Sequence, residues 1–448
     1  MSTKQDKMAT WPIEKLLFSM GIPAVFSMLI QAFYNIIDSI YISKYSADGM
    51  FAVGLANPLQ QVALSIALGG AIGTATLVAR RLGEGRKEEA NAVASTGLVL
   101  ALIHYIIVAL LGIFLSAPFM SLFTKRPEVI DLGYQYLIIC MLFNFGQIYS
   151  IFFERILQAQ GNMLVPTLTQ LLGAIINIIL DPILIFGRYG FPEMGIAGAA
   201  IATVIGQIVS ACFIGYMAIR RKHGVHFSLK SIEFTKERLK DIYVVALPTT
   251  VMNMISSVTT TLLNNILVKF NEDAVTSLSL YFKLQSFVFM PVFGFNQGAL
   301  PILSYTYGAQ NKERYKKTAF LYLSTASVFM AIGTILFYFF PDLLLCFFEM
   351  NDNLKMIAEM TLRIISLSFI PAAVSIVITT VFQSFGRGVI SMMESIMRQI
   401  IFLVPAAYLL SNISLEAVFY AYPIAEVLVV LVFIPLTIKA YRKAFKLA

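Results

Sequence analysis

Charge, histidine and cysteine are all scarce in this chain of 448 residues. Charged residues make up 13% of it, about half the share found in soluble domains. The three cysteines, Cys140, Cys212 and Cys346, have neither the spacing of a zinc site nor the pattern of a disulfide framework. The three histidines form no His-Glu-x-x-His motif, and the sequence has no Gly-x-Ser-x-Gly and no phosphate-binding loop. These absences argue against an enzyme and against direct ATP drive, so neither catalytic residues nor a cofactor are expected.

Long apolar segments make up most of the chain. Hydrophobic residues make up 58% of the chain, and apolar runs of about 20 residues recur along its length, which is the signal of transmembrane helices. The runs and the polar breaks between them predict spans at 14–43, 53–80, 91–116, 129–153, 164–187, 194–219, 239–269, 277–306, 318–340, 354–380, 389–411 and 415–438. The predicted fold class is therefore an all-α integral membrane protein with twelve transmembrane helices.

Lysine and arginine gather in loops that alternation of the spans places on one side of the membrane. They concentrate at 80–87, 220–240 and 312–317 and in the tail after 438, whereas the opposite loops hold few basic residues. Short basic loops stay in the cytoplasm, so both termini are predicted to be cytoplasmic. The protein is expected in the cell inner (plasma) membrane. The basic residues in these loops also explain the net charge of +8. Nucleic acid is therefore not expected as a partner.

The second half of the chain repeats the first at a constant offset in residue number. Equivalent pairs at this one offset include Pro23 and Pro248, Lys44 and Lys269, Gln60 and Gln285, Gly69 and Gly294, and Gly161 and Gly386. One register held over so many spans indicates two pseudo-symmetric six-helix lobes in parallel orientation. The predicted domains are an N-terminal lobe at 1–219, a cytoplasmic linker at 220–238 and a C-terminal lobe at 239–448.

Two carboxylates interrupt apolar spans of the first lobe. Asp38 lies in the first span, close to Tyr34 and Asn35, and Asp181 lies in the fifth, one helical turn after Asn177. An ionisable residue inside the membrane costs several kcal/mol unless it is paired, hydrated or bound to a cation. Asn177 and Asp181 share one helix face, and the two segments are predicted to line one cation-binding cavity. A helix-packing hydrogen bond is the alternative.

The repeat does not extend to these polar residues. The offset that relates the two lobes carries Asp38 to Leu263, Asn177 to Phe402 and Asp181 to Ala406. Polar groups that one lobe has and the other lacks favour a functional role over a packing role.

In its motifs the chain resembles the multidrug and toxic compound extrusion (MATE) transporters. The resemblance rests on Asp38, on Asn177-x-x-x-Asp181-Pro, on Arg-Leu-Gly-Glu-Gly at 81–85 and on Tyr-Gly-Ala-Gln-Asn-Lys at 307–312. It covers essentially the whole chain. It implies the MATE fold and a secondary antiporter that exports lipophilic, often cationic, compounds in exchange for Na⁺ or H⁺. Antibiotic resistance is an expected consequence, and the resemblance leaves the choice between the two ions open.

The resemblance also implies the residues of the coupling site. These are Asp38, Asn177, Asp181 and Thr203, with Tyr34 beside Asp38 and the carbonyl of Ala199 as a further ligand. The first four are the candidate Na⁺ ligands, because their hard oxygen donors suit a small alkali cation. The alternative is that the carboxylates bind protons.

The chain departs from the branch of the family that resembles NorM, which has acidic residues in the seventh and tenth helices. Here those helices carry hydroxyl and amide groups at mid-span, so the chain looks closer to the MepA-like bacterial branch. Candidate residues of the substrate cavity are Asn35, Met252, Asn253, Lys283, Phe287 and Met290. The soft side chains among them suit a surface that accepts many compounds. The protein is expected to act as a monomer.

Three further points stay open from the sequence. Glu154 beside Arg155, and Glu394 one helical turn before Arg398, are interpreted as local ion pairs. Glu426 has no evident partner. A flippase for a lipid-linked precursor shares this architecture and is the alternative function, although the acidic residues of the first lobe favour cationic or neutral cargo.

Overall fold

The structure is a computed structural model that describes residues 7–220, 224–346, 348 and 350–446. Every regular element in these ranges is a helix. Among the described residues, ten helical segments are long and apolar enough to cross a membrane, and the number is twelve when each of two bent helix pairs is taken as one span. The predicted fold class, an all-α membrane protein of twelve spans, is confirmed.

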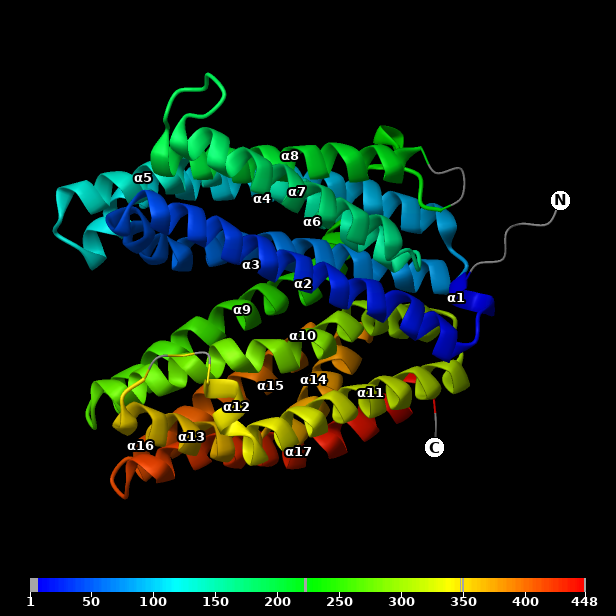
Figure 1. Cartoon of the computed structure of the whole chain (residues 1–448). Coiled ribbons are helices and arrows are strands. Elements are labelled where there is room, and N and C mark those ends of the chain that lie inside the picture. Colours follow the sequence, from blue (N-terminus) through cyan, green and yellow to red (C-terminus); the bar gives the residue numbers. More distant parts are fainter. Residues whose placement is uncertain (1–6, 221–223, 347, 349, 447–448) are drawn as a thin grey trace. The chain divides into compact units, whose positions relative to one another are not determined.

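The first half of the chain supplies six of these spans (Figure 1). Its elements are α1 (Lys7–Thr10), α2 (Ile13–Tyr45), α3 (Ala47–Gly83), α4 (Lys87–Phe123), α5 (Pro127–Leu142), α6 (Phe145–Ala159), α7 (Leu164–Phe186), α8 (Gly195–Ile219) and the 3₁₀ turn η1 (Leu229–Ser231). The helices α5 and α6 meet at an angle of 46° and together make one span. Hydropathy predicted this region as a single span at 129–153, because a bend of this kind leaves the apolar run unbroken.

The second half repeats this order. Its elements are α9 (Lys236–Leu267), α10 (Glu272–Gly308), α11 (Lys312–Phe339), α12 (Pro341–Leu345), α13 (Asp352–Ser366), α14 (Phe369–Ser384), α15 (Gly388–Ile396), the π-helix η2 (Met397–Leu403), α16 (Val404–Leu410) and α17 (Leu415–Ala444). Both ends of α10 are the repeat equivalents of the ends of α3. The bend of 49° between α13 and α14 corresponds to the bend between α5 and α6. The repeat found in the sequence is thus a repeat of helices and of their bends.

Contacts divide the chain into two compact units. The N-terminal unit is Phe26–Thr250, and the C-terminal unit holds the described residues up to Val25 together with those from Val251 onward. The divisions fall inside α2 and α9, at positions that are equivalent in the repeat. Each of these two helices therefore contributes one part to each unit. The division into domains at the 220–238 linker, part of which (221–223) lies outside the described residues, stays a prediction.

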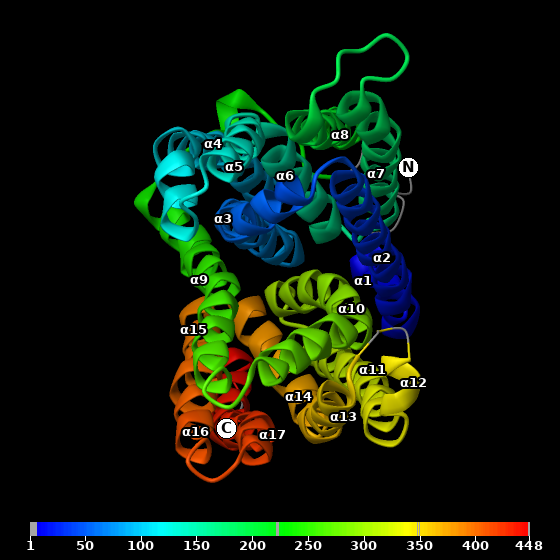
Figure 2. The ribbon, with the colours of Figure 1, turned by 60° about the vertical axis from the view of Figure 1, so that its left-hand side comes forward.

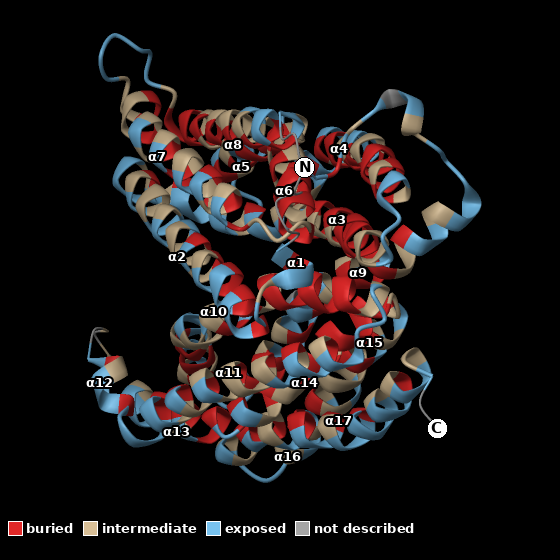
Figure 3. Cartoon of the chain, turned by 90° about the vertical axis from the view of Figure 1, so that its right-hand side faces the viewer, coloured by how far each residue is buried: buried red, intermediate tan, exposed pale blue. Residues whose placement is uncertain are grey.

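The helix α3 lies beside α4, α5 and α6 in the N-terminal unit (Figure 2). Within its most apolar stretch 72% of the residues are buried, more than in the other unbroken spans, and buried residues colour it red in Figure 3. A Cβ atom at Gly69 would lie 2.6 Å from the carbonyl oxygen of Ala246 on α9. Glycine is needed here because it lets two helices approach closely.

One end of the N-terminal unit collects basic loops. Arg81 near the end of α3 is 3.5 Å from Asp241 on α9. The connector before α9 runs along the start of α4, where the N–H of His226 donates to Asn91 Oδ1 (2.8 Å) and that of Ser228 to Ser95 Oγ (3.0 Å). The end of α3 and the starts of α4 and α9 therefore lie on the same side of this unit, as the charge pattern of the loops requires.

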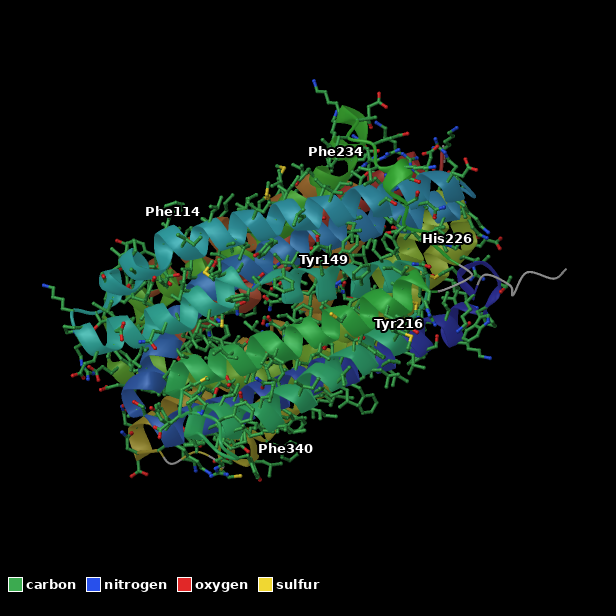
Figure 4. The ribbon with its side chains drawn as sticks, turned by 90° about the horizontal axis from the view of Figure 1, so that it is seen from above. Phe114, Tyr149, Tyr216, His226, Phe234 and Phe340 are labelled. Carbon is green, nitrogen blue, oxygen red and sulfur yellow. The ribbon has the colours of Figure 1, made fainter. Side chains whose placement is uncertain are left out.

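The outer faces of the N-terminal unit carry large apolar side chains. Phe114 on α4 and Tyr216 on α8 point outward in Figure 4, and they are 69% and 52% exposed. Such a surface suits lipid tails rather than water.

A candidate cation site in the N-terminal unit

Small residues bring α7 and α8 together. A Cβ atom at Gly206 would lie 2.9 Å from the carbonyl oxygen of Gly173, and one at Gly198 would lie 2.6 Å from that of Leu184. The small-residue run at 195–203 thus lets the two backbones approach closely. This contact sets the distance between the polar side chains that face each other beside it.

Asn177 connects the two helices. Its amide group donates to Asp181 Oδ1 on the same helix (3.2 Å) and to Thr203 Oγ1 on α8 (3.3 Å). Asp181 is completely buried and Asn177 is 3% exposed. The structure therefore brings together three of the four candidate Na⁺ ligands, in the arrangement expected from the spacing Asn-x-x-x-Asp on one helix face.

Asp38 on α2 completes the group. The carboxyl groups of Asp38 and Asp181 lie close enough to influence each other electrostatically. Two carboxylates this close repel each other strongly unless they share a proton or bind a cation. In addition, Asp38 Oδ1, Asn177 Oδ1 and Asp181 Oδ2 are buried and accept no hydrogen bond from the described residues. Three oxygen atoms of one polar group thus lack a donor, which is an arrangement suited to binding a proton or an alkali cation.

A cavity of about 380 Å³ borders this group. Tyr34, Asn35, Asp38 and Thr203 line it, so the acidic group is reached from the interior of the unit. Ala199 is fully buried in the core of the unit, one helical turn before Thr203. Its side chain packs among apolar residues, and only its backbone carbonyl remains as a candidate ligand.

A second cavity, of about 120 Å³, adjoins the first. One of its lining residues is an acid that the sequence analysis interpreted as part of a local ion pair. Glu154 lines it together with Asn177 and Thr203. Glu154 is 5% exposed and accepts hydrogen bonds from Ser150 Oγ (3.4 Å) and Gln170 Nε2 (3.1 Å). Its neighbour Arg155, the predicted ion-pair partner, donates to Gln158 Oε1 (2.9 Å), and the ion pair with Glu154 stays a prediction. The spacing of Ser150 and Glu154 was visible in the sequence, but the contact with Gln170 depends on how α6 and α7 pack.

The substrate-cavity residues predicted after position 250 lie in the C-terminal unit. Phe287 on α10 lines an apolar cavity of about 520 Å³ there, and Lys283 and Asn253 are exposed. Met252 and Met290 are partly buried on α9 and α10. Their role in substrate binding stays a prediction.

The C-terminal unit has its own buried charges, arranged differently. Arg398 in the π-helix donates to Glu426 Oε1 on α17 (2.9 Å) and lies 3.8 Å from Glu394 on α15. Ser375 donates to Glu426 (2.9 Å), and Thr379 donates to Glu394 (2.8 Å). The predicted pair of Glu394 and Arg398 is present, and Glu426, which had no evident partner, shares the same arginine. Here two carboxylates are compensated by a side chain of the protein itself.

The packing of α7 on α8 yields a prediction about stability. Adding one methyl group in Gly206→Ala places it against the backbone oxygen of Gly173, and a backbone moves only if the helix moves. Overpacking of this kind costs about 1–3 kcal/mol, so the melting temperature of the purified protein should fall. Gly54→Ala is the control, because a methyl group there meets open space and alanine favours a helix. Equal melting temperatures for both variants would contradict the close approach of α7 and α8.

Comparisons with known proteins agree with this architecture. The family model MatE matches residues 23–183 and 248–409, two segments whose first residues are equivalent in the repeat. An "FAD transporter" of Shewanella oneidensis is 25% identical over 428 residues, which cover 93% of this chain and 92% of that protein. The "Multidrug export protein MepA" of Staphylococcus saprophyticus is 24% identical over 414 residues, covering 92% and 90%.

Among solved structures, a MOP superfamily transporter from Pyrococcus furiosus has a TM-score of 0.92 and 23% identity, with all of both chains covered. At this identity the likeness shows the fold. The segments that match the family model make up well over half of the sequence and include both halves of the repeat. The chain is thus a multi-pass membrane protein that belongs to the MatE family, the family of multidrug efflux transporters that its motifs resemble.

Proposed function

We propose that this protein is a secondary antiporter that exports small molecules in exchange for Na⁺ or H⁺ bound between Asp38 and Asp181. The observation that carries the proposal is the group of three buried oxygen atoms without a donor among the described residues, which belongs to Asn177 and to two carboxyl groups that influence each other electrostatically. A site of this kind must take up a positive charge before it can close. Binding and release of that charge would couple the ion gradient to movement of the transporter.

The ligands favour Na⁺, or Na⁺ competing with H⁺, over H⁺ alone. A proton needs only the carboxylates, whereas Asn177 and Thr203 add an amide oxygen and a hydroxyl group at the same place. The test is dye efflux from vesicles under a Na⁺ gradient and, separately, under a pH gradient. If neither gradient drives efflux, the antiport proposal fails.

A chemical labelling experiment separates the two ions. Carbodiimides react with carboxyl groups, so Na⁺ bound at neutral pH should slow labelling of Asp38 and Asp181 compared with choline at the same ionic strength. Asn177→Ala and Thr203→Ala each remove one oxygen, and each should raise the Na⁺ concentration needed for protection about tenfold. Labelling is measured by mass spectrometry of the peptides. If Na⁺ protects nothing while a pH gradient alone drives full efflux, the group is a proton site.

The cargo is inferred from the names of the relatives, and the location from the charge of the loops. Two relatives are called multidrug export or FAD transport proteins, which supports small organic molecules as substrates of this chain. We expect the protein in the plasma membrane with both termini in the cytoplasm, since the basic loops of the N-terminal unit share one side. Antiport of this kind requires neither a second copy of the chain nor a cofactor, so we expect a monomer.

The alternative of a lipid-linked precursor flippase has less support. A pyrophosphate group needs cationic side chains, which bind phosphate through charge-assisted hydrogen bonds. Among the described residues, neither cavity of the N-terminal unit is lined by lysine, arginine or histidine, and they contain Asp38 and Glu154 instead.

A further inference from the structure

The larger cavity of the N-terminal unit is lined mainly by polar residues, and carboxamides are prominent among them. Eight of its lining residues are asparagine or glutamine: Gln31, Asn35, Asn57, Gln60, Gln61, Asn144, Gln147 and Gln207. They come from α2, α3, α6, α8 and the bend before α6. Asp38 is the one charged residue in the described lining, and Tyr34 and Tyr136 are its aromatic residues. This wall is polar but almost uncharged.

Most of these amides are available to a ligand. Asn144 donates to Gln147 (2.9 Å), and Gln60 lies beside Tyr136 and Cys140, whose titration it influences. The other five side chains make no hydrogen bond to a described residue: Gln31, Asn35, Asn57, Gln61 and Gln207. A carboxamide has two N–H donors and an acceptor oxygen, and it is costly to remove from water without partners. A ligand that enters the cavity must therefore offer several donors and acceptors of its own.

A simple lipophilic cation does not meet this requirement. Such cations bind best against aromatic faces and apolar walls. An anionic group is also unsuitable, because the described lining has no basic side chain. The amide edges of a planar heterocycle, in which C=O and N–H groups alternate, match carboxamides group for group. A cavity of about 380 Å³ lies within the size range of small-molecule sites.

We propose that this cavity binds the uncharged heteroaromatic part of the exported compound, one with a lactam, imide or aminopyrimidine edge. Carboxamides from α3 and α8 pair with that edge, and Tyr34 or Tyr136 offers a face for stacking. This inference rests on the proposed export function and specifies its substrate class. It is narrower than the lipophilic, often cationic, compounds that the sequence resemblance implies.

The first test measures binding without any ion gradient. Riboflavin serves as the probe, because it is uncharged, fluorescent and has an imide edge, and 3-methylriboflavin lacks only the imide N–H. Titration of the purified protein should quench riboflavin fluorescence, and the methyl derivative should bind about tenfold more weakly. Tetraphenylphosphonium should not displace riboflavin. Equal affinity for riboflavin and its methyl derivative, or displacement by the cation, would overturn the inference.

Variants then assign the binding to the amides. Gln61→Met and Gln207→Met keep the length of the side chain and remove its donors and acceptor, so each should weaken riboflavin binding about tenfold. Gln135→Met is the matched control, because Gln135 pairs with Asp131 outside the cavity lining. Unchanged affinity in both cavity variants would also overturn the inference.

The riboflavin experiments and the efflux experiments test different proposals, so either proposal can fail while the other stands. If an ion gradient drives dye efflux but riboflavin does not bind, the substrate class is wrong and the antiport stands. If riboflavin binds as described but neither gradient drives transport, the cavity assignment stands and the antiport fails.

Discussion

Asp181→Asn and Asp38→Asn should each reduce gradient-driven efflux to the background of empty vesicles, a loss of at least about tenfold. Each variant removes one of two carboxyl groups that share a buried site, so the charge that recruits Na⁺ or H⁺ is lost while the shape of the side chain is kept. Folding should not suffer, since the repulsion between two like charges is relieved. Efflux from vesicles and the melting temperature of the purified protein are measured on the same preparations.

The control is an acid of the same type at the surface. Asp48 at the start of α3 pairs with Arg126 (2.8 Å) and is partly exposed, so Asp48→Asn should leave efflux unchanged and stability within about 1 kcal/mol. Full efflux in either Asp181→Asn or Asp38→Asn would show that the two carboxylates serve helix packing and not ion coupling. A marked fall in melting temperature would show that the pair stabilises the fold.

The sequence predicted the family, the fold class and the positions of the spans, because these depend on hydropathy and on a repeat of constant offset. It also predicted that Asn177 and Asp181 share a helix face, since that follows from their spacing of one helical turn. That the segments of Asp38 and Asp181 line one cavity was predicted from the cost of burying two carboxylates, but which of their atoms approach each other was not. Helix periodicity cannot say which residues of two distant helices meet.

The carboxamide-lined cavity could not be predicted from the sequence, and the bend between α5 and α6 is one reason. Asn144 lies at that bend and Gln147 follows it one turn later, so both reach the cavity wall. Hydropathy treats 129–153 as one continuous span and gives no sign of a change of direction. Glu154 illustrates the same limit, because its partner Gln170 comes from another helix.

The two units handle buried carboxylates in different ways. In the N-terminal unit Asp38 and Asp181 influence each other without a basic partner among the described residues, whereas Glu394 and Glu426 of the C-terminal unit share Arg398. A built-in guanidinium cannot be exchanged with the solution. We therefore expect ion coupling to depend on the N-terminal unit and the C-terminal network to serve stability.

Arg398→Met should lower the stability of the protein more than other changes in the C-terminal unit, by about 3–5 kcal/mol, because it leaves two buried carboxylates without their cation. The loss should shrink as the pH falls, because protons then neutralise the carboxylates. The folded variant binds more protons than the unfolded chain, so its stability decreases as pH rises. Melting temperatures across a pH series measure both effects.

Two further variants decide whether the arginine acts through these two acids. The triple variant Arg398→Met, Glu394→Gln, Glu426→Gln should recover most of the lost stability at neutral pH, because it removes the buried charges together with their cation. Lys355→Met is the control, since Lys355 and Asp342 form an exposed pair (3.0 Å) that contributes little. If Arg398→Met and Lys355→Met behave alike at every pH, the arginine does not compensate the two buried acids.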